Sequence, residues 1–458
     1  MRIHLIAIGG SAMHNIALAL KANGHDVTGS DDEIYDPART RLEEAGLLPD
    51  DIGWDTERIH TSIDLVILGM HARSDNPELA RALELGVKVY SYPEFVYEMA
   101  RGKQRVVIAG SHGKTTTTSM IMHVLKETGA DFDYLVGAQI PGFEHTARFS
   151  DAPLMVIEGD EYLSSCLDRR PKFLHYRANI AVLTGIAWDH INVFPEFETY
   201  KDQFRQFIES MDKEGQLFYY AHDSDIADIM LTADAPAGSS PYSVFPDADE
   251  RHYGSVLVDG EWVELEMFGR HNLENMNAAF CVCASMGVSK RAFIDAIKTF
   301  SGASRRLQKF IDHDQACVFF DFAHAPSKVK ASIQAVKLQY HHLGIRAVLE
   351  LHTFSSLNKA FLQEYAYTMR EADEAIVFYD EHTLAMKRMP ALGEKYVREA
   401  FMHDNLKVFT QKDELQAYLE DVDWGGYCSL FMSSGNFMKI PVKQIATKKI
   451  DDHMASIK

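Results

Sequence analysis

The stretch VVIAGSHGKTTTTSM, residues 106–120, constrains the fold more than any other part of the sequence. An apolar run ends at Gly110, a short turn carries Lys114, and four threonines then begin a helical pattern. Small residues at such a turn let successive backbone N–H groups face one anion at a helix N-terminus. The pattern therefore predicts a strand, a phosphate-binding loop and a helix, which is a unit of parallel α/β sheets.

This loop departs from the full phosphate-loop pattern, because position 108 is isoleucine and not glycine. Its chemistry is retained, since Lys114 can reach the outer phosphates of a nucleotide and the Thr115 hydroxyl can ligate Mg²⁺. A capped glycine turn without a ligand is the alternative, and the strand directly before the turn argues against it. The residues expected around the phosphates are Gly110, Ser111, His112, Gly113, Lys114, Thr115 and Thr116.

Acidic residues follow a second apolar strand in VIEGDEY, residues 156–162. Carboxylates at the carboxyl end of a strand beside a phosphate loop are suited to hold Mg²⁺, and Glu158 is the first of them. A third strand, in AVLTGIAWDHINVF, is followed by His190, which is a candidate metal or substrate ligand. A solvated acidic turn is the alternative for residues 158–161. We expect the three strand ends to meet at one edge of a sheet.

Residues 1–100 alternate strand and helix patterns, which predicts a further parallel sheet with right-handed crossovers. A Gly9-Gly10 turn follows the first strand, and Asp31 ends the second. This arrangement fits a nucleotide site, for NAD or for another nucleotide, although the full G-x-G-x-x-G pattern is missing. A purely structural turn is the alternative. Residues 233–250 are predicted to form a loop, and a third strand–helix unit begins after residue 307, with a helix through the 360s.

Composition excludes several classes of function. The net charge of −20 argues against nucleic acid or an anionic membrane surface as the main partner. No apolar stretch reaches the length of a membrane span, and no signal peptide is recognised, so we expect a cytoplasmic protein without membrane insertion. The five cysteines, sparse and odd in number, are expected to be buried thiols. A length of 458 residues predicts two to four domains.

Six motifs taken together resemble the Mur ligase family. They occur in this order along the chain: GSHGKTTTT, EGDEY, WDH, GRHNLENMNAA, RRL and DFAHAP. The family's members are ATP-dependent amide-forming enzymes of peptidoglycan biosynthesis, and therefore of cell-wall biogenesis, cell shape and cell division. The resemblance implies a three-domain α/β fold: a Rossmann-like UDP-sugar-binding domain over residues 1–103, a central ATP-binding domain over 104–307, and a Rossmann-like amino-substrate domain over 308–458.

The resemblance also implies roles for individual residues. Lys114 matches the family's phosphate-binding lysine, while Thr115, Glu158 and His190 match its metal-binding residues; we take Lys114, Glu158 and His190 as catalytic. Contacts to the rest of ATP are implied for His271, Asn272, Asn275, Arg306, Asp321 and His324. Gly10, Ser11 and Asp31 are implied to face UDP. Taken singly, the asparagines fit helix caps and Arg306 fits a surface charge equally well.

The reaction implied by the family joins UDP-N-acetylmuramate to an amine through an acyl phosphate, with ATP and Mg²⁺ as cofactors. Two anionic reactants must meet, so the protein supplies positioning and electrostatic stabilisation. A kinase that uses the same loop and a non-catalytic UDP-sugar-binding protein are the alternatives from other classes. The oligomeric state is left open.

Within the family, the stretch DEYLSSCLDRRPKFLHY most resembles the murein peptide ligase branch, whose amine is the tripeptide L-Ala-γ-D-Glu-meso-diaminopimelate recovered in peptidoglycan recycling. The alternative is the L-alanine-adding branch of de novo synthesis. The sequence departs from the family's pattern at two points that concern recognition of the amine. Ala325 stands where the family usually has a second histidine, and ELHTFSSLN lacks the arginine expected there. A tripeptide needs additional cationic or polar partners. The candidates are Arg169, Arg170, Lys172, His352, Thr353, Ser355 and Ser356.

Overall fold

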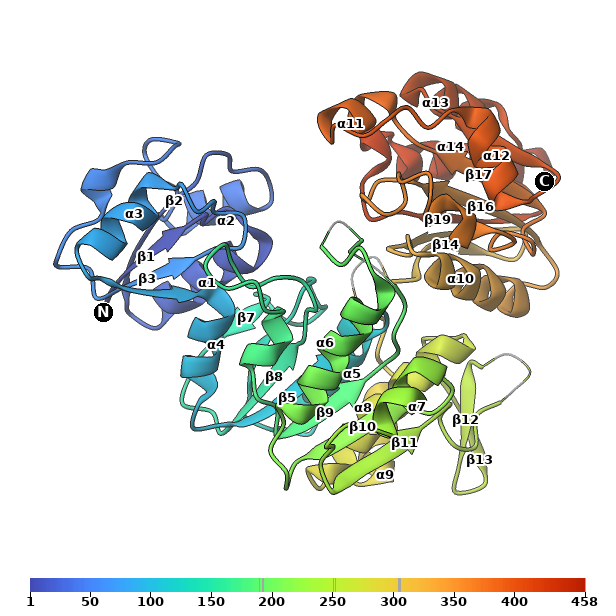
Figure 1. The fold of residues 1–458 in the computed structure, drawn as a ribbon. Coiled ribbons are helices and arrows are strands. Elements are labelled where there is room, and N and C mark those ends of the chain that lie inside the picture. Colours follow the sequence, from blue (N-terminus) through green and yellow to red (C-terminus); the bar gives the residue numbers. More distant parts are fainter. Residues whose placement is uncertain (189, 192, 250, 252, 304–305, 458) are drawn as a thin grey trace. The chain divides into compact units, whose positions relative to one another are not determined.

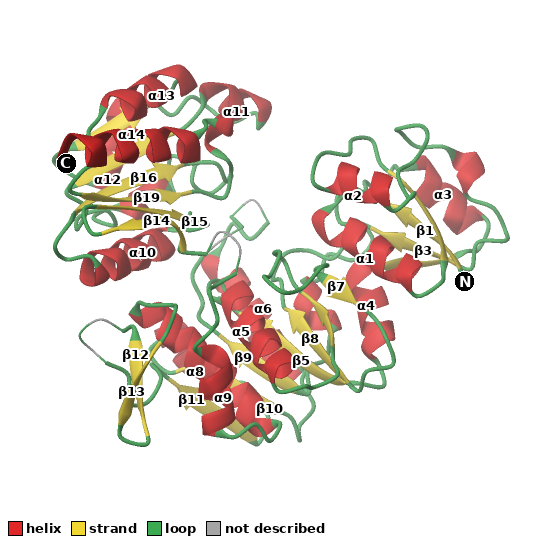
Figure 2. Cartoon of the chain, turned by 180° about the vertical axis from the view of Figure 1, so that it is seen from behind, coloured by secondary structure: helices red, strands yellow, loops and turns green. Residues whose placement is uncertain are grey.

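The computed structural model describes residues 1–457 except 189, 192, 250, 252, 304 and 305, with the side chains of residues 456 and 457 also left out. The described chain forms two compact units. The first comprises residues 1–186, 197–243 and 275–297, and the second comprises 187–196, 244–274 and 298–458. Three parallel-rich sheets with helices around them confirm the expected α/β class (Figures 1 and 2).

The N-terminal sheet has four parallel strands in the order β2-β1-β3-β4. Its centre is apolar because β3 is buried along its whole length and packs with residues of β1 and α3. The elements are β1 (Arg2–Ile6), α1 (Ser11–Ala22), β2 (Asp26–Ser30), α2 (Ala38–Glu44), η1 (Thr56–Arg58), β3 (Leu65–Leu68), α3 (Pro77–Glu84), β4 (Lys88–Ser91) and α4 (Tyr92–Ala100).

The seven-stranded sheet of the first unit has the order β11-β10-β9-β5-β8-β6-β7, and all its pairs are parallel except β6 with β7. The crossover through α5 leads from β5 towards β6, and the crossover through α6 leads from β9 towards β10. These opposite directions create a switch point between β5 and β9. The elements are β5 (Gln104–Ala109), α5 (Lys114–Glu127), β6 (Asp133–Leu135), β7 (Ala147–Arg148), β8 (Leu154–Glu158), η2 (Lys172–His175), β9 (Ile180–Leu183), α6 (Phe197–Glu209), β10 (Gln216–Tyr220), α7 (Ser224–Met230), β11 (Gly238–Tyr242), α8 (Arg270–Ser285) and α9 (Lys290–Ile297).

The sheet of the second unit has six strands in the order β14-β15-β19-β16-β17-β18, with β14 antiparallel at one edge. Alternate residues of its strands enter two separate apolar clusters, which cover the two faces of the sheet. A hairpin of β12 (Ser255–Val258) and β13 (Glu261–Glu264) precedes it. The other elements are β14 (Gln308–His313), β15 (Ala316–Asp321), α10 (Pro326–Gln339), β16 (Gly344–Glu350), η3 (Leu362–Tyr365), β17 (Glu374–Phe378), α11 (Glu381–Met386), α12 (Glu394–Phe401), β18 (Leu406–Phe409), α13 (Lys412–Asp421), β19 (Tyr427–Met432), η4 (Phe437–Lys439) and α14 (Val442–Ile457).

Two local predictions were wrong. Residues 238–242 form the edge strand β11 and not a loop, because their backbone pairs with β10 although the sequence GSSPY carries no strand periodicity. The predicted helix through the 360s is only the short 3₁₀ turn η3. The β12–β13 hairpin turns at Asp259-Gly260, with both turn residues at positive φ.

The expectation of five thiols was also wrong, because Cys317 and Cys428 form a disulfide. Cys317 lies opposite Cys428 in the parallel register of β15 and β19, within the apolar cluster on one face of the sheet. The two residues are 111 positions apart in sequence, so their spacing gives no sign of this register. Cys166, Cys281 and Cys283 are free thiols.

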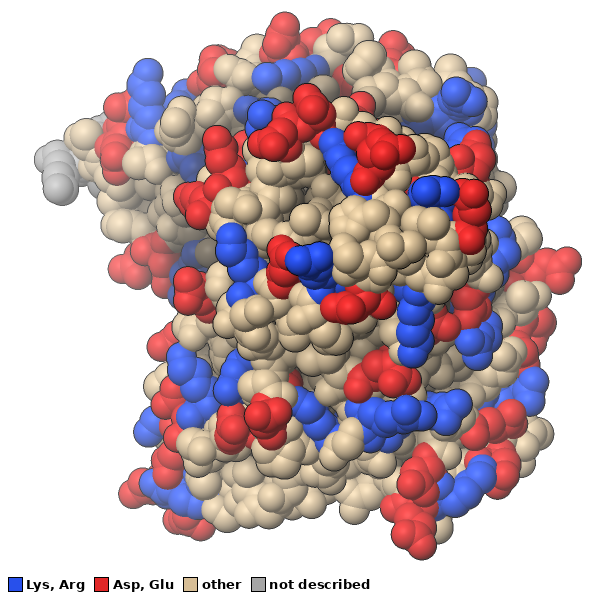
Figure 3. Space-filling view, turned by 90° about the vertical axis from the view of Figure 1, so that its left-hand side faces the viewer, with Lys and Arg blue, Asp and Glu red and all other residues tan. Residues whose placement is uncertain are grey.

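Acidic and basic side chains are interspersed over the face drawn in Figure 3. Among the described residues, no helix combines the length and the apolar character that a membrane crossing requires.

Candidate active site

The predicted phosphate loop lies at the carboxyl end of β5, which is flanked by β8 and β9 in parallel register. Gly110 and Gly113 have φ of 127° and 78°, values that side chains with a Cβ rarely adopt. A Cβ at Gly110 would collide with Thr184, which follows β9, and a Cβ at Gly113 would collide with Asn275 of α8. Both glycines therefore let neighbouring chain approach the loop closely, and α5 starts directly after Gly113.

Lys114 is the first residue of α5, directly after the loop. Its Nζ donates to the carbonyl of Gly110 at 2.6 Å and lies 2.7 Å from Oε2 of Glu161. Burial alone would lower the pKa of Lys114, but the carboxylates of Glu161, Asp160 and Glu158 outweigh burial and raise that pKa. The ammonium is therefore charged at neutral pH and available to an anionic ligand.

Glu161 and Tyr200 complete a ring of contacts around the lysine that the sequence did not predict. The Tyr200 hydroxyl lies 3.2 Å from Oε1 of Glu161 and 2.8 Å from Oγ of Ser111, a loop residue. Glu161 and Tyr200 are 1 % and 0 % exposed, so these contacts are shielded from water. Tyr200 comes from α6, far along the chain, and its position could not be read from any local motif.

Thr115 and Glu158 meet as predicted. The Thr115 hydroxyl donates to Oε1 of Glu158 at 2.7 Å, and the backbone N–H of Gly137 donates to Oε2 at 2.7 Å. A hydroxyl and a carboxylate are hard oxygen ligands of the kind that Mg²⁺ prefers. The pair therefore fits a magnesium ion beside the phosphate loop, and the bond from Gly137 fixes the orientation of the carboxylate.

The other loop residues are buried at the same edge of the sheet. Thr184 binds the loop twice, through its hydroxyl to the carbonyls of Ala109 at 3.1 Å and of His112. Thr116 is buried, and the Thr117 hydroxyl lies 3.3 Å from Oδ1 of Asn275. The structure thus brings Asn275 to the first turn of α5. Its contact with ATP, which the family resemblance implies, stays a prediction.

His190 lies in the 187–196 segment, which belongs to the second unit. It has a φ of 55°, and its carbonyl accepts from the N–H groups of Val193 and Phe194 at 2.8 and 2.9 Å. Its role as a metal ligand stays a prediction. Its neighbour Asp189, the acidic residue of the WDH motif, lies outside the described residues.

A second set of predicted residues gathers within the second unit. His271 is half-buried, and desolvation lowers its pKa against the opposing effects of the carboxylates of Asp321 and Glu274. Asp321 accepts from the N–H of Leu307 at 3.2 Å and from the hydroxyl of Ser332. The Arg306 guanidinium lies 4.3 Å from the ring centroid of Phe322. Leu307 thus contacts Asp321 while the preceding residue, Arg306, contacts Phe322, so the two segments lie side by side.

Two further predicted residues of this set are held by backbone contacts. The His324 ring lies beside Phe322, and its Nδ1 is 2.7 Å from the carbonyl of that residue. Asn272, in the first turn of α8, donates through its side-chain amide to the carbonyl of Phe268 at 2.8 Å and so ties the helix to the segment before it. A nucleotide-binding role for these residues stays a prediction.

Asp31 closes the N-terminal turn, and its predicted contact with UDP stays a prediction. The backbone N–H of Gly9 donates to Oδ2 of Asp31 at 2.7 Å, while Gly10 caps α1 and Ser11 begins it. Burial and the neighbouring Asp32 raise the pKa of Asp31 to about 6, against the bond from Gly9. A carboxylate with a perturbed pKa at a strand end is typical of a ligand site, and the proposed ligand there is UDP.

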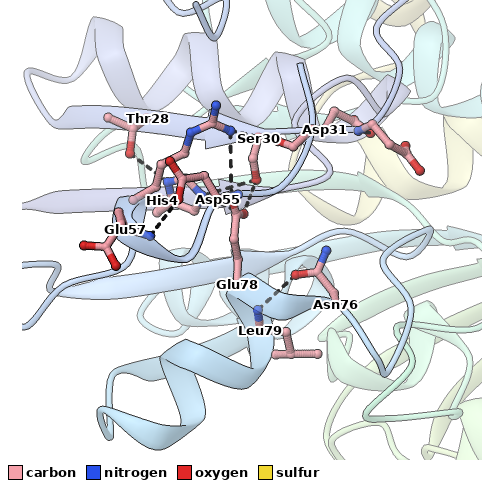
Figure 4. Close-up of polar contacts among 12 residues, drawn as sticks. His4, Thr28, Ser30, Asp31, Asp55, Glu57, Asn76, Glu78 and Leu79 are labelled. Atoms are coloured by element: carbon pink, nitrogen blue, oxygen red, sulfur yellow. Dashed lines mark hydrogen bonds and ion pairs between the residues drawn. The ribbon is translucent and has the colours of Figure 1, made fainter. Parts of the chain in front are cut away.

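Beneath this turn lies a buried polar cluster around Glu78, drawn in Figure 4. The Glu78 carboxylate accepts from the Ser30 hydroxyl and from the N–H of Asp55 at 2.8 Å, and His4 Nε2 lies 3.3 Å from it. Burial alone would raise the pKa of Glu78, but these bonds hold it below its ordinary value. Figure 4 shows Ser30 pointing into the cluster and Asp31 pointing away from it, so the cluster anchors the strand end that carries Asp31.

The stretch DEYLSSCLDRRPKFLHY folds back on itself beside the acidic strand end. Lys172 is buried, pairs with Asp160 at 2.5 Å, and lies 5.5 Å from the ring centroids of both Tyr92 and Tyr162. Arg170 pairs with Asp168 at 2.6 Å, whereas Arg169 is exposed. Lys172 is therefore an internal cation of this stretch and not part of a solvated basic face.

The predicted candidates in the second unit lie at the carboxyl ends of β16 and β19, the central strands of its sheet. Glu350, which sequence reasoning missed, accepts from the hydroxyl of Ser433 and from the N–H of Phe437 at 2.9 Å. Gly435 lies against both Glu350 and His352, since a Cβ there would approach their side chains within 3 Å. Thr353 and Ser356 bond each other at 2.9 Å, and Ser355 is buried.

Two family models match the chain. The Mur ligase middle domain matches residues 108–283, and the Mur ligase family catalytic domain matches residues 2–104. Together these matches cover the N-terminal turn, the phosphate loop, the acidic strand end and most of α8.

Curated relatives match over nearly the whole length. The chain is 30% identical over 97% of its length to the UDP-N-acetylmuramate–L-alanine ligase of Carboxydothermus hydrogenoformans, of which it covers 96%. It is 27% identical over 98% of its length to the UDP-N-acetylmuramate–L-alanyl-γ-D-glutamyl-meso-2,6-diaminoheptandioate ligase of Haemophilus influenzae, of which it covers 99%. Among solved structures, a murein peptide ligase from Psychrobacter arcticus has a TM-score of 0.69 at 24% identity, with 97% of this chain and 98% of that one covered.

Proposed function

Because the chain belongs to the Mur ligase family, and is thus an ATP-dependent ligase that forms a carbon–nitrogen bond, we propose a specific reaction for it. The lactyl carboxylate of UDP-N-acetylmuramate is joined to the amino group of the tripeptide L-Ala-γ-D-Glu-meso-diaminopimelate. Family membership sets aside the alternatives of a kinase and of a non-catalytic UDP-sugar-binding protein.

The chain's own residues define what each sheet contributes to this reaction. The N–H groups after Gly110 and the ammonium of Lys114 bind and orient the phosphates of ATP, and Thr115 with Glu158 would hold Mg²⁺. Magnesium, when bound, neutralises the charge that develops on the transferred phosphoryl group. Asp31 and the Gly9-Gly10 turn bind the UDP end of the substrate, and the polar residues near Glu350 bind the amine.

The observation that supports the tripeptide as amine is the stretch of residues 160–176. It is a folded element with its own bridge between Leu163 and Pro171, its own 3₁₀ turn η2 and the internal pairs of Arg170 and Lys172. It is also the stretch that resembles the murein peptide ligases in sequence. The Haemophilus influenzae relative, named as a ligase of the tripeptide, matches 98% of this chain's length.

The alternative amine is L-alanine, and a specific observation favours it. The Carboxydothermus hydrogenoformans relative, named as an L-alanine ligase, has the higher identity of the two curated relatives compared above. Both reactions use the same nucleotide and the same UDP-linked acid, so the phosphate loop and the N-terminal turn do not discriminate between them.

The experiment that decides between the two amines compares kcat/KM for the tripeptide and for L-alanine, at fixed ATP, Mg²⁺ and UDP-N-acetylmuramate. The proposal predicts a preference for the tripeptide. A tenfold preference for L-alanine, which corresponds to about 1.4 kcal/mol, would replace it with the alternative.

A further inference from the structure

Three potential metal ligands meet away from the phosphate loop, within the first unit. They are Glu94 of α4, Asp168 of the 160–176 stretch and His175 of η2. One ligand atom from each lies within 4.8 Å of the other two. None of the three has a place in the proposed reaction.

The buried histidine provides the second observation. His175 has a side chain that is only 5 % exposed, yet its Nε2 has no hydrogen-bond partner among the described residues. That nitrogen lies 3.4 Å from Oδ2 of Asp168, towards the acidic pair. Burial, together with the charge of Arg170, lowers the pKa of His175 against the opposing charges of Asp168 and Glu94, and this favours the neutral imidazole. A buried polar atom without a hydrogen bond is costly and calls for a partner.

We propose that Glu94, Asp168 and His175 bind a divalent transition-metal ion of the zinc class, which fastens α4 to the 160–176 stretch. An imidazole with two carboxylates is a ligand set for such an ion and a poor one for Mg²⁺, which takes oxygen ligands. Bonds of roughly 2.1 Å would hold the ligand atoms roughly 3.5 Å apart, so the widest spacing must contract by about 1 Å. Water supplies the fourth ligand from the exposed side.

Arg170 competes with this ion for the carboxylate of Asp168. Its guanidinium binds Asp168 through Nε at 3.0 Å and Nη2 at 2.6 Å, and its side chain is 61 % exposed. An exposed guanidinium can leave the carboxylate at little cost, because surface ion pairs are weak. The structure therefore makes a directional prediction: removal of Arg170 strengthens metal binding, whereas removal of any of the three ligands weakens it.

Glu94 allows a substitution that separates the metal from the fold. Its Oε2 accepts from the N–H of Ser91 at 2.8 Å and from the Ser91 hydroxyl at 2.7 Å, in a capping box at the start of α4. Glutamine also serves at this position of a capping box. Glu94→Gln thus keeps the helix cap and removes the anionic ligand.

The test uses full-length protein, stripped with EDTA and kept in excess Mg²⁺ so that the Thr115–Glu158 pair does not capture the probe. Co²⁺ is titrated in and its visible absorption is followed, and Zn²⁺ is then added as a competitor. We expect one equivalent of Co²⁺, displaced by Zn²⁺. Affinity should fall at least tenfold in Glu94→Gln, vanish in His175→Ala and rise in Arg170→Ala. His145→Ala is the matched control, since His145 lies 3.8 Å from a single carboxylate, that of Glu144, and should change nothing.

A wild-type protein that binds no Co²⁺ overturns the proposal. So does an affinity that neither Glu94→Gln nor His175→Ala lowers. If His175→Ala does not fold, the opposite shifts expected from Glu94→Gln and Arg170→Ala decide the question. Because the readout is metal binding, failure here leaves the ligase proposal untouched, and loss of ligase activity would leave this one untouched.

Discussion

The ammonium of Lys114 and the carboxylate of Glu161 lie 2.7 Å apart at the carboxyl edge of the seven-stranded sheet. Glu161 is almost fully buried, and its second oxygen faces the hydroxyl of Tyr200. An incoming phosphate would compete with this carboxylate for the lysine. The pair therefore sets both the position of the lysine ammonium and the affinity with which it binds a nucleotide phosphate.

Lys114→Ala should leave the fold intact and abolish ligation, because the substitution removes the only cation that the described loop residues 110–116 carry. Loss of one such electrostatic contact costs on the order of 3 kcal/mol or more in the transition state, or over a hundredfold in rate. Phosphate release and circular dichroism measure the two effects. Lys126→Ala, at the other end of α5, is the control and should stay active. Near-normal turnover in a folded Lys114→Ala protein would contradict the phosphate-loop assignment.

Tyr200→Phe should lower kcat/KM for ATP by roughly tenfold with little loss of stability. The substitution keeps the ring, which packs on Phe204, and removes the hydroxyl between Ser111 and Glu161. Loss of a buried hydrogen-bond partner costs about 1–2 kcal/mol. Tyr97→Phe, which keeps the ring that faces Arg105, is the matched control. Identical ATP kinetics in both variants would show that the ring of contacts does not position Lys114.

Glu158→Gln and Thr115→Val should each raise the Mg²⁺ concentration needed for half-maximal rate, because the two side chains meet at 2.7 Å and offer oxygen ligands. Thr115→Ser keeps the hydroxyl and should behave like the wild type. His190→Ala should likewise raise the Mg²⁺ concentration needed for half-maximal rate. Rates measured across a Mg²⁺ series test this, and unchanged curves would assign these residues a structural role.

The parts of the site that the sequence predicted share one property: each follows directly from a strand end. Gly110–Thr116 and Glu158 follow two neighbouring strands of the seven-stranded sheet, whereas Asp31 follows β2 of the N-terminal sheet. Parallel strands bring their ends to one edge of a sheet, so the meeting of the loop with Glu158 could be inferred without coordinates. Asn275 was predicted only through the family resemblance, since nothing in its local sequence points to the loop.

The parts that the sequence did not predict depend on register and packing between distant segments. Tyr200 reaches Ser111 from α6, a helix that begins at Phe197, 86 residues after Ser111. The Cys317–Cys428 disulfide depends on the register of β15 with β19, and β11 is a strand because β10 offers it a partner. Spacing and periodicity carry no information on such pairings, because they are decided by tertiary structure.

Asp31 should give the folding stability a distinct pH dependence. Its pKa is raised from 3.8 to about 6 in the folded protein, so the folded state binds its proton more tightly than the unfolded state does. The resulting stabilisation is fully present below pH 4 and is lost as pH rises through about 6. Asp31→Asn removes the titrating carboxyl group and with it this pH-dependent contribution to stability. The test compares the urea midpoints of the two proteins from pH 4 to 8. The midpoint of the variant should rise relative to that of the wild type up to about pH 6.5, and the difference should then stay constant. A difference that is constant across the whole range would show that the pKa of Asp31 is not raised.

The most direct test of the account follows an oxygen atom through the reaction. UDP-N-acetylmuramate labelled with ¹⁸O in its lactyl carboxylate is incubated with ATP, Mg²⁺, the tripeptide and the full-length protein, and the released phosphate is analysed by mass. If the phosphate loop activates that carboxylate as an acyl phosphate, attack of the amine leaves one labelled oxygen in every phosphate released and forms one amide per ATP consumed. Unlabelled phosphate, or phosphate release without amide product, would contradict the central claim.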